Sequence, residues 1–154
     1  MRIAVLSGKG GTGKTFVSTN LADAIGDVTY IDCDIEEPNG YLFLKPKVEK
    51  SWNVSVTIPE FDTDKCRGCR KCVQFCQYNA LAFIKGKPRL FPEICHSWGG
   101  CALVCPNGAV SETKREIGII EQGQADGITV LTGILKNGEA TGVPIIRELV
   151  RSTP

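Results

Sequence analysis

Several features are scarce in this chain of 154 residues, and each absence narrows its function. Positive and negative charges nearly cancel, and the formal net charge of +1 gives no reason to expect nucleic acid or an acidic membrane as a partner. No apolar run approaches the length of a transmembrane helix. The chain turns into glycines soon after Leu6, which is unlike a secretory signal, so we expect a cytoplasmic location.

Cysteine, in contrast, is abundant. Seven of the eight cysteines lie between Cys66 and Cys105, while Cys33 stands alone and is expected to be a small buried residue. Tight C-x-x-C spacing without a secretory signal favours metal binding over a disulfide framework. The length suits one domain carrying a small insert, and the dense cysteines mark that insert.

Residues 66–109 contain an internal repeat with a constant offset of 29 residues. The first run is C-R-G-C-R-K-C-V-Q-F-C from Cys66, and the second is C-H-S-W-G-G-C-A-L-V-C from Cys95. A C-x₂-C-x₂-C-x₃-C run is typical of bacterial ferredoxins, and in two-cluster members its fourth cysteine ligates the other cluster. The pattern therefore predicts one [4Fe–4S] cluster held by Cys66, Cys69, Cys72 and Cys105.

The second predicted cluster has only three thiols, those of Cys76, Cys95 and Cys101. Its fourth position is Trp98, which cannot ligate iron, so three outcomes stay open: a [3Fe–4S] cluster, a [4Fe–4S] cluster with a non-thiolate ligand, or no stable cluster. His96 is next to Cys95 rather than at the missing position, and we expect it at the surface. Zinc competes for C-x-x-C sites, but these runs lack the two separated pairs of a zinc ribbon.

The residues around the cysteines suggest a protected redox centre. Residues 83–90 are expected to form a hairpin between the two runs. We expect an apolar shell that keeps water from the clusters, made of Phe75, Phe83, Leu90, Phe91 and Leu103. The basic residues Arg67, Arg70 and Lys71 are either a solvated face or a docking patch for an acidic electron-transfer partner.

A different motif stands near the N-terminus. Residues 8–15 match G-x-x-x-x-G-K-[ST], a loop whose backbone N–H groups surround phosphates at the start of a helix. We expect a strand over 2–6 and a helix over 15–25, with Lys14 on the terminal phosphates and Thr15 on Mg²⁺. The candidate nucleotide contacts are Gly8, Lys9, Gly10, Gly11, Thr12, Gly13, Lys14 and Thr15.

Acidic residues follow a second expected strand, over 28–32. Asp32 and Asp34 would lie at the carboxyl end of that strand and face the phosphate crevice, or they would cap a turn there. Further strands are expected over 41–44, 54–58, 115–122 and 128–135, with a turn at 123–127 and a helix over 143–151. The strand aspartate that holds Mg²⁺ in P-loop nucleotidases is missing, because the only aspartate beyond Asp64 is Asp126 in the turn.

Residues 9–15, K-G-G-T-G-K-T, resemble the deviant Walker A loop of the MinD/ParA/Mrp/nitrogenase-iron-protein class. The chain is similar to the N-terminal half of MinD-superfamily ATPases (the CobQ/CobB/MinD/ParA group) that carry an inserted ferredoxin domain. The resemblance implies ATP and Mg²⁺ as cofactors and a homodimer through the P-loop face. It also implies catalytic roles for Lys14, for Lys9 reaching the partner's nucleotide, and for Asp34 in activating water.

The resemblance further implies an α/β fold, a P-loop partial parallel sheet with an inserted bacterial-ferredoxin-like α+β module. The nucleotide-binding part would be residues 1–58, the insert 59–112, and a truncated continuation of the α/β domain 113–154. The chain departs from the family in two ways. Family members are about twice as long, and the absent half holds the Walker B aspartate, which argues against hydrolysis by this chain alone. The second cluster also lacks a cysteine.

Two functions follow from the sequence. The first is an ATP-binding iron–sulfur protein that couples ATP to electron transfer or cluster transfer. The alternative is a ferredoxin-type electron carrier, or an iron–sulfur assembly scaffold, with a non-hydrolysing P-loop. Either version implies a redox or iron–sulfur client protein as partner.

Overall fold

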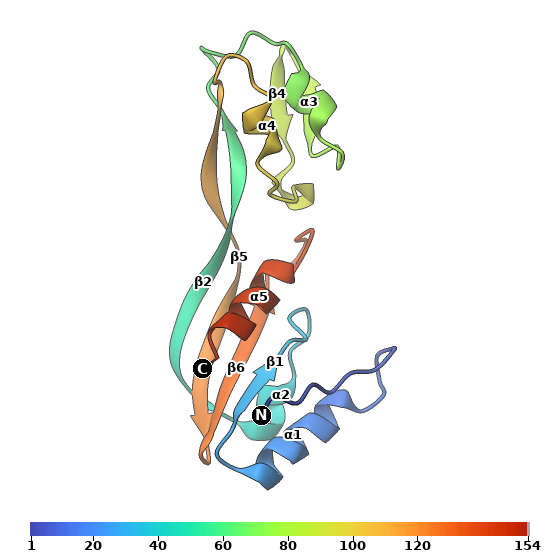
Figure 1. The fold of residues 1–154 in the computed structure, drawn as a ribbon, viewed down its shortest axis with the longest axis vertical. Helices are drawn as coiled ribbons and strands as arrows, with labels where there is room; N and C mark the ends of the chain where they lie inside the picture. Colours follow the sequence, from blue (N-terminus) through green and yellow to red (C-terminus); the bar gives the residue numbers. More distant parts are fainter. Residues whose placement is uncertain (154) are drawn as a thin grey trace. The chain divides into compact units, whose positions relative to one another are not determined.

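The computed structural model describes residues 1–153 (Figure 1). Helices and short strands alternate along the chain, with two long strands, β2 and β5, on either side of the cysteine runs. In chain order the elements are α1 (Lys14–Ile25), β1 (Thr29–Asp32), α2 (Gly40–Leu44), β2 (Lys47–Phe61), α3 (Lys71–Phe75), β3 (Leu81–Ile84), β4 (Lys87–Leu90), the 3₁₀ turn η1 (Pro92–Ile94), α4 (Gly100–Leu103), β5 (Val110–Ala125), β6 (Ile128–Leu135) and α5 (Val143–Arg151).

Four of the strands form one mixed sheet in the order β1-β6-β5-β2. β1 runs parallel to β6, with Thr29 opposite Thr129. β5 and β6 are antiparallel and form a hairpin in which Ala125 pairs with Ile128. The turn is therefore two residues, Asp126 and Gly127, both with positive φ, which suits Asp-Gly in a tight hairpin. The expected turn at 123–127 is too long, because residues 123–125 continue the strand.

The chain divides into two compact units. One holds residues 1–54, 118–135 and 143–154, and the other holds residues 55–117 and 136–142, so β2 and β5 contribute to both. In the first unit, Ile145 and Leu149 of α5 are fully buried. A Cβ at Gly133 of β6 would lie 2.8 Å from both side chains, so the absence of a side chain at this position lets α5 pack closely against the sheet.

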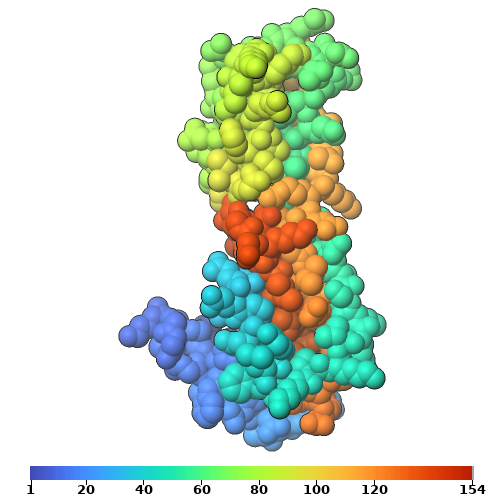
Figure 2. Space-filling model, turned by 180° about the vertical axis from the view of Figure 1, so that it is seen from behind, coloured from blue at the N-terminus to red at the C-terminus, as the bar shows by residue number. Residues whose placement is uncertain are grey.

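Two expected strands of the first unit are wrong. Residues 1–7 form no helix or strand, and the exposed fractions of Ile3 and Leu6 are 53% and 86%. Figure 2 shows part of the blue N-terminal region of the chain projecting from the surface of its unit. Residues 41–44 lie in helix α2, because the buried carboxylate of Asp32 accepts hydrogen bonds from the N–H groups of Asn39 (3.2 Å) and Gly40 (2.8 Å) and fixes the start of that turn.

Other expected elements are confirmed, with longer strands than the sequence predicts. The hairpin at 83–90 is β3 and β4, with Leu81 opposite Leu90 and a turn at Lys85 and Gly86. The strand at 54–58 is the middle of β2, and that at 115–122 is the middle of β5. Across residues 1–153 we find no helix with the length and apolar character needed to span a bilayer. The complete P-loop fold stays a prediction.

Candidate metal centre

The 29-residue sequence repeat is also a repeat of the backbone. Left-handed φ angles recur in pairs at that offset: Gly68 (70°) with Ser97 (57°), Arg70 (62°) with Gly99 (71°), and Asn79 (53°) with Gly108 (58°). Hydrogen bonds recur as well, since the N–H of Cys76 donates to Val73 and that of Cys105 to Ala102, both at 3.3 Å. Each run therefore folds into a loop, one short helix and a turn, α3 in the first and α4 in the second.

Four thiols line one hollow in the second unit. They come from Cys66 and Cys69 before α3, from Cys72 in its first turn, and from Cys105 after α4. Apolar side chains form much of the remaining wall, including Phe61, Phe83, Pro88, Ala109 and Val110, and the polar residues Arg67, Arg70 and Asn107 also line it. Four thiols facing an apolar hollow are the donor set of a [4Fe–4S] cluster, so the residues fit the group that the sequence predicts.

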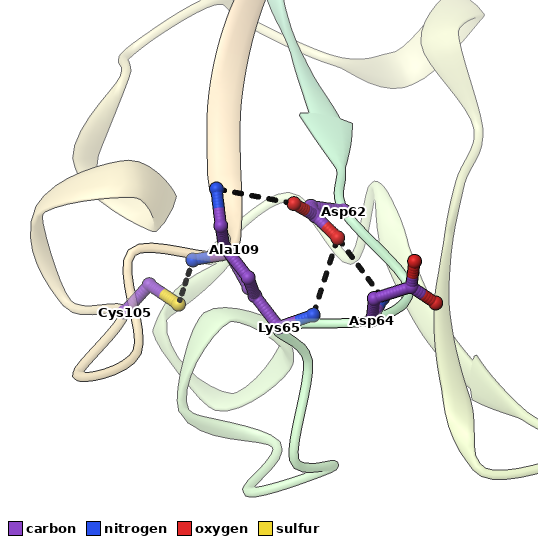
Figure 3. A network of polar contacts seen from close by, with 5 residues as sticks. All are labelled: Asp62, Asp64, Lys65, Cys105 and Ala109. Atoms are coloured by element: carbon purple, nitrogen blue, oxygen red, sulfur yellow. Dashed lines mark hydrogen bonds and ion pairs between the residues drawn. The ribbon is translucent and has the colours of Figure 1, made fainter.

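A network of hydrogen bonds positions this hollow (Figure 3). The carboxylate of Asp62 accepts the N–H groups of Asp64 (2.9 Å) and Lys65 (3.1 Å), and its backbone N–H donates to the carbonyl of Ala109 at 2.9 Å. The N–H of Ala109 donates in turn to Sγ of Cys105 at 3.3 Å. Hydrogen bonds to ligating sulfur tune the reduction potential of a cluster. The sequence analysis did not single out Asp62 or Ala109, although the Asp-Thr-Asp-Lys segment that begins at Asp62 is typical of an Asx turn.

The thiols of each predicted site lie close enough to influence one another. Burial raises the pKa of the Cys72 thiol, and charge on Cys66 and Cys69 raises it further. Burial also raises the pKa of the Cys101 thiol, and charge on Cys95 and Cys76 adds to the effect. This grouping of thiols is the one that cross-run ligation requires, with Cys76 beside the second run.

An iron–sulfur cluster and a single zinc ion need different arrangements of thiols. A tetrahedral zinc site with Zn–S bonds of about 2.3 Å needs its sulfur atoms about 3.8 Å apart. In a cluster, each iron takes a different thiolate. The cysteine spacing, with the fourth thiol of the first hollow supplied by Cys105 of the other run, favours the cluster.

The second site is bordered by aromatic side chains. The ring of His96 stacks on Tyr78 with centroids 3.7 Å apart, and Trp98 lies 5.9 Å from the same ring in a tilted arrangement. Trp98 is 77% exposed. Phe75 packs against Gly100, where a Cβ would lie 2.3 Å from the ring, so α3 and α4 approach closely at this point.

The expected apolar shell is only partly right. Phe83 lines the first hollow and also carries the guanidinium of Arg70 at 4.5 Å from its ring centroid. Leu103, in contrast, is 89% exposed, and Phe75 and Phe91 are also exposed. Cys33, expected to be buried, is exposed. Gly100 of α4 faces Phe75, while Leu103, the last residue of the same short helix, stays exposed.

The candidate phosphate loop folds onto itself. The ammonium of Lys14 donates to Ser7 Oγ (3.0 Å) and to the carbonyl of Lys9 (3.2 Å), and Thr12 Oγ1 lies 2.6 Å from Ser7 Oγ. Residues 8–13 are exposed, and the helix expected after them is α1. Asp32 does not face this loop freely, because its carboxylate also accepts the N–H of Asp34 at 3.1 Å; it has the structural, turn-capping role.

Comparison with known proteins supports the cysteine region. A family model described as a 4Fe-4S dicluster domain matches residues 58–106. A ferredoxin of Pyrobaculum islandicum is 40% identical over 55 residues, which cover 35% of this chain and 51% of the ferredoxin. The hydrogenase-2 operon protein HybA of Escherichia coli O157:H7 is 31% identical over an alignment of 109 residues, covering 53% of this chain and 33% of that protein.

A longer alignment extends beyond the cysteines. An uncharacterized protein of Methanocaldococcus jannaschii is 34% identical over 126 residues, covering 80% of this chain. The chain spans only 44% of the length of that relative. The relative's name gives no activity that could be transferred.

The resemblance to MinD/ParA-type ATPases is wrong as an assignment of family. The matching family model is a 4Fe-4S dicluster domain, and no P-loop ATPase family matches. The K-G-G-T-G-K-T segment suggested the ATPase, but the strand that such a loop requires before it is not formed. Residues 58–106 therefore match a 4Fe-4S dicluster domain of the ferredoxin type.

Proposed function

We propose that this chain is a ferredoxin-type electron carrier. The observation that carries the proposal is the hollow in which Cys66, Cys69, Cys72 and Cys105 meet, within the residues that match the dicluster domain. Clusters held there would supply reversible one-electron chemistry at low potential. The chain's own residues would fix that potential: the thiols hold the iron, the apolar walls limit water, and the Ala109 N–H partly neutralises the charge on Cys105.

Anaerobic reconstitution followed by protein-film voltammetry tests this function. We expect reversible one-electron reduction of the loaded full chain, at a potential that MgATP does not shift. The matched control is Cys33→Ala, which removes an exposed cysteine outside both sites and should leave the wave unchanged. A fully loaded protein with no reversible wave contradicts the proposal.

The side of the first site that includes Cys69 is the part that a redox partner could reach. Cys69 is exposed, and so are the neighbouring Arg67, Arg70 and Lys71. The ring of Phe83 holds the Arg70 guanidinium in place, which lowers the entropy lost when it pairs with a carboxylate. These features favour an acidic electron-transfer protein as partner.

Charge reversal at Arg67 and at Lys71, one residue at a time, tests that partner. We expect electron transfer to an acidic redox protein to slow by about tenfold or more at low salt, because steering of oppositely charged partners raises association rates by about 10–10³. Lys85→Glu, in the β3–β4 turn, is the control for total charge. Equal slowing by the control variant would refute a specific patch.

Nucleotide binding is a second candidate, favoured by the loop of residues 8–15. Gly11 and Gly13 have left-handed φ angles of 71° and 85°, and the Lys14 ammonium is held over the loop. Calorimetry with MgATP tests the candidate, with Lys14→Ala as the non-binding control. Absence of binding by the unmodified chain rejects this candidate and leaves the electron carrier.

A further inference from the structure

The second site lacks a thiol that its sequence position should supply. Trp98 stands 29 residues after Cys69, where the repeat calls for a ligand. Trp98 is 77% exposed as a whole residue, and its ring lies 5.9 Å from that of Tyr78. The neighbouring His96 ring is stacked on the same tyrosine. Cys76, Cys95 and Cys101 therefore need a fourth ligand from elsewhere if they are to hold a four-iron cluster.

Ser97, between these two aromatic residues, carries a buried oxygen with no partner. Its Oγ is inaccessible to solvent and has no hydrogen-bond partner among residues 1–153. Leaving a buried hydroxyl unpaired costs about 1–3 kcal/mol. Buried polar atoms in folded proteins are nearly always paired, so this one calls for a partner that binds at the site.

The backbone conformation of Ser97 adds to the free-energy cost of the unpaired hydroxyl. Its φ of 57° is left-handed, and its equivalent in the first run is Gly68 at 70°. A left-handed residue other than glycine costs roughly 1–2 kcal/mol. At Gly68 a Cβ would meet Phe83 at 3.3 Å and the carbonyl of Gly86 at 3.4 Å, so the first run has little room for a side chain there. The second run has a hydroxyl at the corresponding place and lacks the thiol one residue later.

We propose that Ser97 Oγ is the fourth protein ligand of the second cluster, in place of the missing cysteine. Ligation replaces the hydroxyl proton, which goes to solvent, by a bond to iron, and no electron changes hands. The inference rests on the proposed function in one respect, that the second site holds a cluster. It assigns the ligand set Cys76, Cys95, Cys101 and Ser97.

Iron and sulfide analysis with EPR on the anaerobically reconstituted full chain tests the assignment. We expect about eight iron atoms per chain and no three-iron signal in the unmodified protein. Ser97→Ala and Ser97→Gly should both lose about one iron, and after oxidation with ferricyanide they should show the EPR signal of an oxidised [3Fe–4S] cluster. The glycine variant relieves the left-handed strain, so a loss in both variants reports the hydroxyl. Ser97→Cys should keep all the iron.

Two further variants make the outcomes decisive. Ser111→Ala in β5 is the control for an exposed serine and should change nothing. Trp98→Cys, which restores the fourth cysteine, should make Ser97→Ala harmless. A full iron content in Ser97→Ala would overturn the proposal and make Ser97 a hydrogen-bond donor instead. A three-iron cluster in the unmodified chain would also overturn it. Loss of the reversible wave with the iron content intact would refute the electron carrier but not this ligand.

Discussion

Cross-run ligation makes a prediction that separates two ways of building the clusters. Cys105 lies in the second run, yet its thiol lines the hollow formed by Cys66, Cys69 and Cys72. The double variant Cys66→Ala/Cys105→Ala therefore removes two ligands from one site and none from the other. Its matched counterpart, Cys101→Ala/Cys105→Ala, removes one ligand from each site although both changes lie in the same run.

The expected magnitudes follow from counting ligands. With about eight iron atoms in the unmodified chain, the Cys66/Cys105 variant should keep about four, all of them at the second site, whose EPR and Mössbauer signals should be unaltered. The Cys101/Cys105 variant should alter both signals, because each site is left one thiolate short. Each variant carries two substitutions, so a general loss of stability is matched between them.

The opposite pattern would refute the reasoning. If each run built its own cluster, the Cys101/Cys105 variant would keep one site intact and the Cys66/Cys105 variant would damage both. Iron and acid-labile sulfide per chain, measured with Mössbauer spectra on ⁵⁷Fe-loaded protein, distinguish the two patterns without reference to electron-transfer activity.

Two further predictions concern the scaffold. Leu149→Ala should lower the free energy of unfolding by about 3 kcal/mol in urea titrations, because this side chain of α5 is fully buried. Val150→Ala, at the exposed next position, should change the free energy of unfolding by less than about 0.5 kcal/mol. Backbone N–H donors from Lys65 and Asp64 lower the pKa of Asp62, so its contribution to stability is complete above about pH 4 and is lost as the pH falls through the lowered pKa. The stability difference between the unmodified chain and Asp62→Ala should therefore shrink in acid, and a pH-independent difference, or an equal effect of Asp23→Ala on α1, would argue against this role.

The cysteine region was the most predictable part of the chain, because ligand spacing is a local constraint. The 29-residue offset predicts which thiols group together, and the structure brings Cys105 to the first run and Cys76 to the second. The hairpins follow from local turn chemistry, such as Asp126-Gly127 between two apolar runs. In these places the nearest neighbours in sequence decide the conformation.

The errors arose where distant contacts decide. Residues 41–44 have the apolar composition of a strand, but hydrogen bonds from Asn39 and Gly40 to the buried Asp32 carboxylate start a helix there. The apolar run before Ser7 satisfies every local requirement of a strand and still has no sheet partner. Ser97 has no strong sequence signal either, since a serine beside a cysteine is ordinary until its oxygen is seen to be buried and unpaired.

The position of Cys105 gives the dicluster domain the properties of a crosslinked chain. A cluster held by both Cys72 and Cys105 would close a loop of the 33 positions that separate them. In the chain-entropy estimate used for disulfides, closing a loop of that length stabilises the folded state by about 4 kcal/mol. The closure lies beside the hydrogen bond from Asp62 to Ala109, where β2 ends and β5 begins. Removing the iron with a chelator or with oxygen would therefore loosen the ends of both strands. Protein that has been exposed to oxygen would then be cleaved by proteases faster than protein kept anaerobic.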